Sequence, residues 1–203
     1  MNLKTLLAVV AVGTATFTTA RMTAEPAPQD GFDMEAMMEA MRLAQPGPEH
    51  EELAKMLSGE WETDVSVKGM GPDSTPMKTN GTESAVAILD GRFIEVTSQG
   101  AFMGQPFESR SFIGYDRRHE QFTSVGMDTL GTYWVTATGK RDADGVIRMK
   151  GEDDDPAGKQ VYTFEYETIS EDEREFRVIF SQIGGQVYEE PFTMVTVRSR
   201  RKR

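Results

Sequence analysis

Apolar and polar side chains alternate along most of the chain from Trp61 onward. The first stretch places apolar or small side chains at every second position, namely Trp61, Thr63, Val65 and Val67. This period of two is typical of a β-strand with one buried face. Nine similar stretches follow, and they read GTESAVAIL, RFIEVTSQGAF, FESRSFIGY, QFTSVGMD, TYWVTATGK, VIRMKGE, QVYTFEYETI, REFRVIFSQ and PFTMVTVRSR. The pattern therefore predicts ten strands, all within residues 59–203.

Turn residues separate several of these stretches. Asp-Gly pairs at 90–91 and 144–145 supply the positive φ angles of tight hairpins. Pro-Ala-Gly at 156–158 and Gly-Gly at 184–185 suit longer loops. Consecutive strands joined by hairpins form an antiparallel sheet, which closes because exposed strand edges favour aggregation. The expected fold is all-β, an up-and-down antiparallel β-barrel of about ten strands with room for one small ligand.

A helical pattern precedes the first strand, in the stretch PEHEELAKMLSGEW. Pro48 stands in the first turn, and acidic residues follow it where the helix dipole favours negative charge. The apolar positions recur at helical spacing, at Leu53, Met56 and Leu57. Gly59 ends the segment. We expect this helix to close one end of the barrel, with Trp61 packed beneath it.

A methionine-rich segment, FDMEAMMEAMRLAQ, lies further upstream. Its methionines recur at spacings of three and four, at Met34, Met37, Met38 and Met41. Asp33 is placed to cap a helix and Pro46 to stop it. Methionine adapts to irregular surfaces. A helix over residues 32–44 would therefore either pack on the protein's own domain or dock to a protein partner.

The first residues, MNLKTLLAVVAVGTATFTTA, combine an early cation, a short apolar run and small residues ending at Ala20. This is the pattern of a secretory signal peptide, and the apolar run is shorter than the roughly 20 residues that span a bilayer. Cleavage would leave a soluble protein in the periplasm or outside the cell, without stable membrane insertion. The predicted organisation is signal peptide 1–20, disordered linker 21–31, N-terminal helices 32–58 and barrel domain 59–203.

Composition excludes several kinds of site. The chain has no cysteine, which removes disulfides, thiol nucleophiles and thiolate metal sites. Its formal net charge is −11, and a surface that acidic repels nucleic acid and anionic membranes. The last six residues, RSRRKR, hold five cations and form either a small docking tail or an ordinary solvated end.

Motifs of known chemistry are missing from the sequence. His50 begins a His-Glu pair that lacks the second histidine of a zinc-binding helix, and His119 has no suitable neighbour either. There is no Gly-x-Ser-x-Gly elbow and no phosphate-binding glycine loop. The acidic run at 152–155 does not have the spacing of a calcium-binding loop. We therefore assign no catalytic residue, no metal and no cofactor.

Polar residues inside predicted strands are the candidates for a ligand site. Glu95, Arg110 and Asp128 would serve as polar anchors in an apolar cavity if they face inward. Aromatic residues available as lining include Trp134, Tyr162 and Phe164. Alternation does not decide which way the polar residues face, because stretches such as RFIEV carry apolar groups on both faces.

Three functions remain open on these residues. The first is non-catalytic binding of a small apolar or amphipathic ligand inside the barrel. The second is an enzyme whose acid and base are carboxylates in the same cavity, such as Glu95 with Asp128. The third is a protein-interaction module that uses the methionine-rich helix.

Seven separated motifs carry a resemblance to a known family. They are PGPEH (46–50), LSGEW (57–61), LDGRFIEV (89–96), MGQPFE (103–108), GYDRR (114–118), MDTLGT (127–132) and a final strand that ends in basic residues. The chain resembles an uncharacterised bacterial family, domain of unknown function 1579, over about residues 42–200. The resemblance implies a barrel akin to lipocalins and other calycins. In those barrels a Gly-x-Trp step at the first strand pairs with a basic residue near the last strand.

On this chain the resemblance places that structural latch at Gly59, Trp61 and Arg198, with the cation over the indole face. Related barrels that bind haem use a histidine on a late strand. Here His50 lies at the start of a helix and His119 in a turn-like stretch, so haem is not expected. The family has no established activity, and the resemblance therefore implies a fold rather than a function.

Overall fold

The computed structural model describes residues 33–69 and 71–203. The predicted signal peptide (1–20) and linker (21–31) lie outside the described residues. Residues Met38–Arg203 form one compact unit, which contains all the strands of the described residues. In the part of the chain that the structure describes, no helix is both long and apolar enough to cross a membrane.

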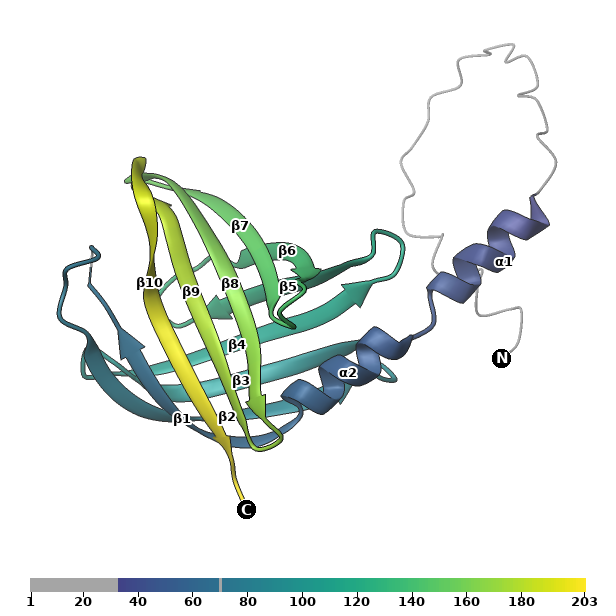
Figure 1. Ribbon diagram of the computed structural model, residues 1–203, viewed down its shortest axis with the longest axis horizontal. Coiled ribbons are helices and arrows are strands. Elements are labelled where there is room, and N and C mark those ends of the chain that lie inside the picture. The colour runs from purple at the N-terminus through teal and green to yellow at the C-terminus, as the bar shows by residue number, and fades with distance from the viewer. Residues whose placement is uncertain (1–32, 70) are drawn as a thin grey trace, which may run out of the picture. The chain divides into compact units, whose positions relative to one another are not determined.

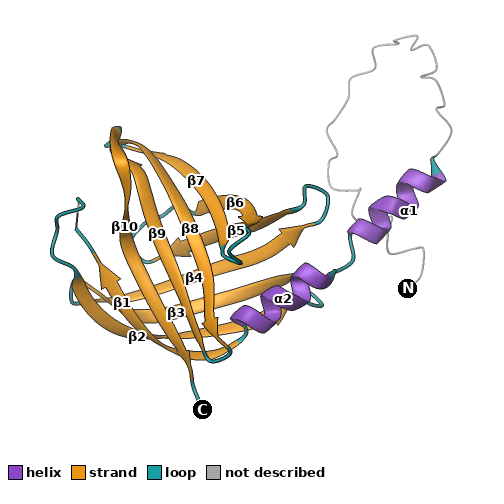
Figure 2. Cartoon of the chain, viewed as in Figure 1, coloured by secondary structure: helices purple, strands orange, loops and turns teal. Residues whose placement is uncertain are grey.

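Ten antiparallel strands form a closed barrel (Figures 1 and 2). The strands are β1 (Gly59–Val67), β2 (Met77–Ile88), β3 (Phe93–Phe102), β4 (Gln105–Asp116), β5 (Gln121–Asp128), β6 (Val135–Arg141), β7 (Ile147–Asp155), β8 (Gly158–Ser170), β9 (Glu173–Ile183) and β10 (Gln186–Arg201). Each strand pairs with its neighbours in the chain, and β1 pairs with β10 to close the sheet. The predicted fold and strand number are confirmed.

Local geometry accounts for the hairpins and for closure. Gly91 and Gly145 have φ angles of 81° and 86°, so the two Asp-Gly turns adopt the positive φ expected of them. Closure aligns Trp61 with Arg201 and Val67 with Val195. β10 carries bulges where it pairs with β9, and such bulges bend a strand as a closing sheet requires.

Among the described residues, two helices precede the barrel, α1 (Met34–Leu43) and α2 (Pro48–Leu57). Asp33 Oδ1 accepts a hydrogen bond from the Ala36 N–H at 3.0 Å, as expected of a cap, and no side chain of α1 is buried. α2 contacts β2, β3 and β4 and buries Leu53 and Leu57. The predicted closing helix is therefore present.

The barrel has two unlike ends, because an up-and-down sheet sends alternate turns to opposite ends. The helix end consists of α2 together with the turns that follow β2, β4, β6 and β8 (Figure 1). The open end consists of the loops that follow β1, β3, β5, β7 and β9. The largest fully buried side chains are Leu53, Leu57, Trp61, Ile94, Ile113, Ile147 and Met149. They gather beneath α2, so the dense core lies at the helix end.

Candidate ligand-binding cavity

A cavity of about 870 Å³ lies inside the barrel. It begins beneath Met56 and Leu57 of α2 and extends to Met103 and Leu130 in loops of the open end. Several interior side chains are only half-buried, including Phe176. Because such residues point into the barrel, their remaining exposed surface faces this cavity.

Aromatic side chains form one wall of the cavity. This aromatic wall consists of Tyr162, Phe164 and Tyr166 on β8 with Phe176 and Phe180 on β9. The rings of Tyr162 and Phe164 are stacked with centroids 5.0 Å apart, and Tyr166 lies 4.7 Å from Phe176. The Tyr162 hydroxyl donates to the Thr136 carbonyl at 3.1 Å. The wall is a continuous apolar surface. The hydroxyl group of Tyr162 at its edge already has a hydrogen-bond partner.

Small and polar side chains form the facing wall. Glu83, Ser98, Ser109 and Asp128 occupy neighbouring positions on β2, β3, β4 and β5, because Glu83 aligns with Ser98, Ser98 with Ser109, and Ser109 with Asp128. All four line the cavity, and we call them the polar row. β3 and β4 lie five strands around the barrel from β8 and β9 respectively. The polar row and the aromatic wall are therefore on opposite sides of the cavity.

Tyr166 and Ser124 line the cavity from opposite sides of the barrel interior. Burial raises the pKa of the Tyr166 phenol, and a side-chain hydrogen bond with Ser124 opposes that rise. Ser124 is on β5 and Tyr166 on β8, so this contact spans the barrel interior.

Three of the six predicted ligand residues line the cavity, and three do not. Asp128, Tyr162 and Phe164 are part of its lining. Asp128 Oδ1 also accepts the Leu130 N–H at 2.8 Å. Trp134 lies in the loop before β6 with 67% of its surface exposed.

Glu95 and Arg110 are on the outer surface, where Glu95 Oε1 and Arg110 Nη1 are 3.7 Å apart. Ile94 and Val96 on either side of Glu95 are buried inside the barrel, and alternation then turns Glu95 outward. Ser109 and Ser111 line the cavity, so Arg110 between them also points outward. The proposed acid–base pair of Glu95 with Asp128 does not assemble, because the two carboxylates are on opposite faces of the sheet.

The latch at the helix end contains Gly59 and Trp61, but its cations are Arg174 and Arg201. Each guanidinium carbon lies 4.2 Å from the centroid of the Trp61 ring, which is 1% exposed. Arg201 is opposite Trp61 in the β1–β10 register. Gly59 has a φ of 132°, and a β-carbon there would press against Arg201 Nη1.

Arg198, placed in this latch by resemblance, lies elsewhere. Its Nε contacts Glu173 Oε1 at 2.8 Å, and it is aligned with Asp64 rather than with Trp61. The reason is strand parity, because the side chains of Val197 and Ser199 point into the cavity and Arg198 between them must point out. The alternation of inward and outward side chains along β10 can be read from the sequence. The alignment of β10 with β1, which places Arg201 opposite Trp61, cannot.

Arg174 is the buried charge of the helix end. Its Nη1 donates to the Leu57 carbonyl at 2.9 Å, and its Nη2 is hydrogen-bonded to the Glu83 carboxylate. The side chains of Arg174 and Glu83 are 8% and 13% exposed. Burial, together with the nearby Arg201, lowers the pKa of Arg174 to about 9, and the group still carries its charge at neutral pH.

The last carbonyls of α2 are satisfied by the same residues. Leu57 O accepts the Trp61 Nε1–H at 3.0 Å as well as Arg174, and Ser58 O accepts from Arg201 Nη1 at 2.8 Å. Two cations at the C-terminus of a helix also interact favourably with the helix dipole and so stabilise the helix. The arrangement fixes α2 over the barrel and serves structure rather than chemistry.

The open end presents apolar side chains to solvent. Met77, Met103, Leu130 and Tyr133 line the cavity and are nevertheless exposed, Met103 to 72% and Tyr133 to 63%. Asp153 and Asp155 lie on the same half of the cavity. A rim of exposed apolar groups around a hollow interior is typical of a ligand entrance.

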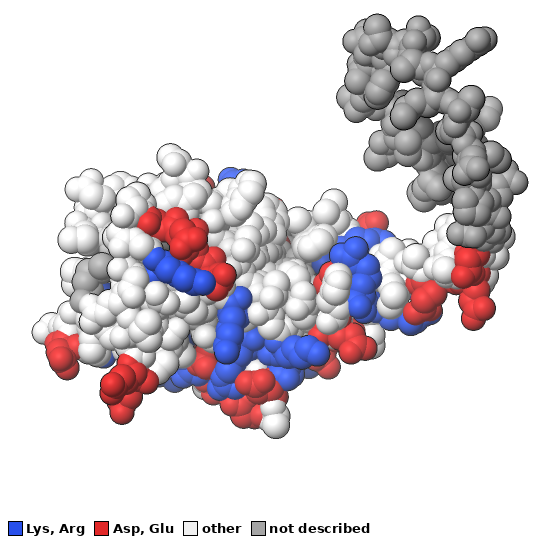
Figure 3. All heavy atoms as spheres, turned by 90° about the horizontal axis from the view of Figure 1, so that it is seen from above, with Lys and Arg blue, Asp and Glu red and all other residues white. Residues whose placement is uncertain are grey.

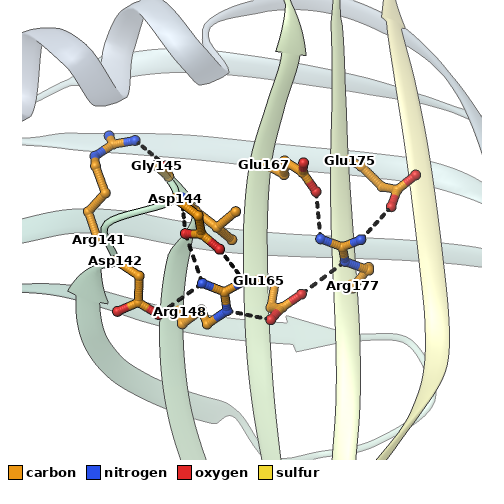
Figure 4. A network of polar contacts seen from close by, with 10 residues as sticks. Arg141, Asp142, Asp144, Gly145, Arg148, Glu165, Glu167, Glu175 and Arg177 are labelled. Carbon is orange, nitrogen blue, oxygen red and sulfur yellow. Dashed lines mark hydrogen bonds and ion pairs between the residues drawn. The ribbon is translucent and has the colours of Figure 1, made fainter.

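The outer face of β7, β8 and β9 carries a network of ion pairs (Figure 4). Glu165 accepts hydrogen bonds from Arg148 Nε at 2.6 Å and from Arg177 Nε at 2.9 Å. The other carboxylates that the two arginines contact are Asp142, Asp144, Glu167 and Glu175. Figure 3 shows acidic and basic side chains interspersed over the face in view. Because each charge in the network has a partner, the network braces the sheet.

Within residues 33–69 and 71–203, no group of three or more histidines and carboxylates is arranged to hold a metal ion. His50 is buried, and its Nδ1 accepts the Gly47 N–H at 3.0 Å. His119 Nδ1 lies 2.8 Å from Asp116 in a surface turn. Both histidines therefore have local structural partners.

The chain belongs to the family described as "Protein of unknown function (DUF1579)", which matches residues 45–201. The matched segment includes α2 and all ten strands up to the end of β10. A search of the curated proteins finds no match. The family description assigns no activity, and a functional proposal must therefore be argued from the cavity itself.

Proposed function

We propose that the protein binds one small apolar or amphipathic molecule inside the barrel, without acting on it chemically. The observation that carries this proposal is the cavity of about 870 Å³. Cavities that hold small ligands typically measure about 300–1,000 Å³ and combine apolar walls with a few polar groups. The aromatic wall and the polar row provide that combination.

The ligand enters through the open end. At the helix end, the latch around Trp61 and the packed side chains of α2 close the barrel. At the open end, exposed side chains such as Met103 and Tyr133 line the route into the interior. Binding would remove this apolar surface from water, which is the main driving force for taking up an apolar molecule.

We also propose that the protein is exported, with residues 1–20 as its signal peptide. The ligand would then be met in the periplasm or outside the cell. The mass of the protein isolated from its source tests this directly, because cleavage after Ala20 removes a defined set of residues. A mature protein that retains residues 1–20 contradicts export by this route.

Nile red, an uncharged dye that fluoresces in apolar surroundings, tests binding in the cavity. A Gly126→Phe variant should block the site, because Gly126 lines the cavity and a β-carbon there meets Ser111 Cβ at 3.6 Å and Val135 Cγ2 at 3.7 Å. These are ordinary van der Waals contacts, so the added ring has room to extend into the cavity. We expect saturable binding to the unmodified protein and at least a tenfold loss of affinity in the variant.

Thr123→Phe provides the matched control. Thr123 is on the same strand, between the buried Phe122 and Ser124, and therefore faces outward. Its variant should bind Nile red like the unmodified protein. Equal binding by both variants would place the dye outside the cavity, and no binding by the unmodified protein would remove the main support for the proposal.

A further inference from the structure

We propose that the ligand is an uncharged, flat ring molecule that carries hydrogen-bonding groups along one side. This inference rests on the proposed function and specifies the class of ligand. It follows from the opposition of the aromatic wall and the polar row, from the free hydroxyl groups of that row, and from the charges that line the cavity.

A ligand that contacts both walls needs an apolar side that faces the aromatic wall and a polar side that faces the polar row. The aromatic wall consists of five rings, of which Tyr162 and Phe164 are stacked on one another at an interplanar angle of 27°, while the other pairs are tilted or meet edge-to-face. A rigid ring of a ligand can pack on such rings in an offset-stacked or edge-to-face arrangement, and it loses less conformational entropy on binding than a flexible chain does. The polar row lies across the cavity and contacts the other side of a molecule held there.

Two hydroxyl groups of the polar row are available for a ligand. Glu83 is held by Arg174, and Asp128 accepts a backbone hydrogen bond at its Oδ1. Ser98 and Ser109 line the cavity next to each other, and their hydroxyls form no side-chain hydrogen bond with any residue that the structure describes. A hydroxyl can donate as well as accept, so this pair suits carbonyl, ether or hydroxyl groups on the ligand.

The charges around the cavity disfavour an anionic ligand. Of the described residues that line it, two are cations, Lys68 and Arg174. Arg174 is paired with Glu83, and Lys68 Nζ donates to the Pro72 carbonyl at 3.1 Å. The carboxylates of Asp128, Asp153 and Asp155 line the same cavity. Among the described lining residues, Lys68 is therefore the one cation without a carboxylate partner, and a carboxylate or phosphate group on the ligand would meet more negative than positive charge.

Three fluorescent probes of different chemistry test this class. Nile red is flat, uncharged and carries a carbonyl group; pyrene is flat without polar groups; cis-parinaric acid is a linear chain that ends in a carboxylate. We expect the dissociation constant of Nile red to be at least tenfold lower than that of cis-parinaric acid. Tighter binding of the acid would overturn the proposed class and leave binding in the cavity intact.

A Ser98→Val, Ser109→Val double variant tests the hydrogen bonds. It should weaken Nile red binding by roughly tenfold, because it removes both hydroxyl groups that can hydrogen-bond to the ligand, and leave pyrene binding unchanged. Unchanged pyrene binding also shows that the variant is folded and its cavity intact. Thr97→Val is the matched control, because Thr97 lies between inward-facing residues and points outward.

The remaining outcomes separate the two proposals. Equal loss of Nile red and pyrene in the double variant would mean that the serines shape the cavity rather than recognise a ligand, which overturns their assigned role. An unchanged affinity for Nile red would do the same. Failure of all three probes to bind the unmodified protein would count against binding in the cavity altogether.

Discussion

The two ends of the barrel use the same strands for opposite purposes. At the helix end, the largest side chains are fully buried, and the buried arginine is paired and hydrogen-bonded. At the open end, apolar side chains such as Met103 and Leu130 are exposed around a cavity of about 870 Å³. One end of the barrel therefore holds the fold together, and the other is free to be hollow.

This division explains why a hollow barrel is stable. A cavity forfeits packing contacts along its walls, and the loss must be offset elsewhere. Here α2, Trp61 and the residues beneath them form a compact core at one end, and the barrel closure leaves no open sheet edge. Variants at the helix end should therefore change stability strongly, and matched variants at the open end should change it little.

The two tryptophans of the chain provide the sharpest test of this difference. Trp61→Ala removes a fully buried ring and its contacts with Arg174 and Arg201, and should lower the free energy of unfolding by about 3–5 kcal/mol. Trp134→Ala removes a ring that is 67% exposed at the open end and should change it by less than about 0.5 kcal/mol. Urea unfolding followed by circular dichroism measures both. Similar effects in the two variants would break the comparison.

Buried and exposed ion pairs offer a second test. Arg174→Met leaves the Glu83 carboxylate without its partner, and removing one member of a buried pair typically costs about 3–5 kcal/mol. Because Glu83 is 13% exposed, we expect a loss near about 3 kcal/mol. Adding Glu83→Gln should recover part of it by removing the unpaired charge. A double-mutant cycle in urea unfolding measures this coupling.

The outer pair of Arg110 with Glu95 is the control for that cycle. Its closest atoms are 3.7 Å apart, and the Arg110 side chain is 57% exposed. Arg110→Met should therefore change the free energy of unfolding by no more than about 1 kcal/mol. If Arg174→Met proved equally mild, the helix end would not depend on its buried charge.

Two glycines make a third and smaller comparison. Gly59→Ala combines a φ of 132° with a β-carbon that meets Arg201, and the strain should cost about 1–3 kcal/mol. Gly126 faces the cavity without positive φ, so Gly126→Ala should be neutral or slightly stabilising. Thermal unfolding of the two variants measures the difference. A tolerated Gly59→Ala would show that the latch adjusts freely around β1.

Local patterns in the sequence were enough for the fold. The period of two, the Asp-Gly turns and the helix signals around Pro48 all act within a few residues, and the structure has ten strands and α2 where these signals predict them. Such local signals do not determine which residues of neighbouring strands lie opposite one another. Glu83 and Arg174 are 91 residues apart in the chain, and only the closed barrel brings them together.

The cavity could be predicted only in part for the same reason. Of the residues proposed from the sequence, Asp128, Tyr162 and Phe164 line it. Glu95 could not be oriented, because its strand carries apolar groups on both faces, with Phe93 exposed and Ile94 buried. The polar row depends on the alignment of four strands, and no single stretch of sequence contains it.

Acidification should weaken the helix end through His50, and this is the smallest effect that we expect. Burial lowers the pKa of His50 below its ordinary value of 6.5, and the ring accepts the Gly47 N–H at the start of α2. The unfolded chain therefore binds a proton more readily than the folded protein as the pH falls below about 6.5. Stability should be flat above that pH and decline as the pH falls below it.

The assignment to His50 can be isolated by substitution. His50→Gln should remove this part of the pH dependence, because glutamine keeps an acceptor without titrating. Asp116, whose pKa is lowered chiefly by its hydrogen bond with Arg118, acts in the same direction but only below about pH 4. Urea unfolding of the unmodified protein and of His50→Gln at pH 5, 6 and 7.5, above the range in which Asp116 acts, therefore isolates the part due to His50. A slope that survives in His50→Gln would move the pH sensitivity away from the helix end.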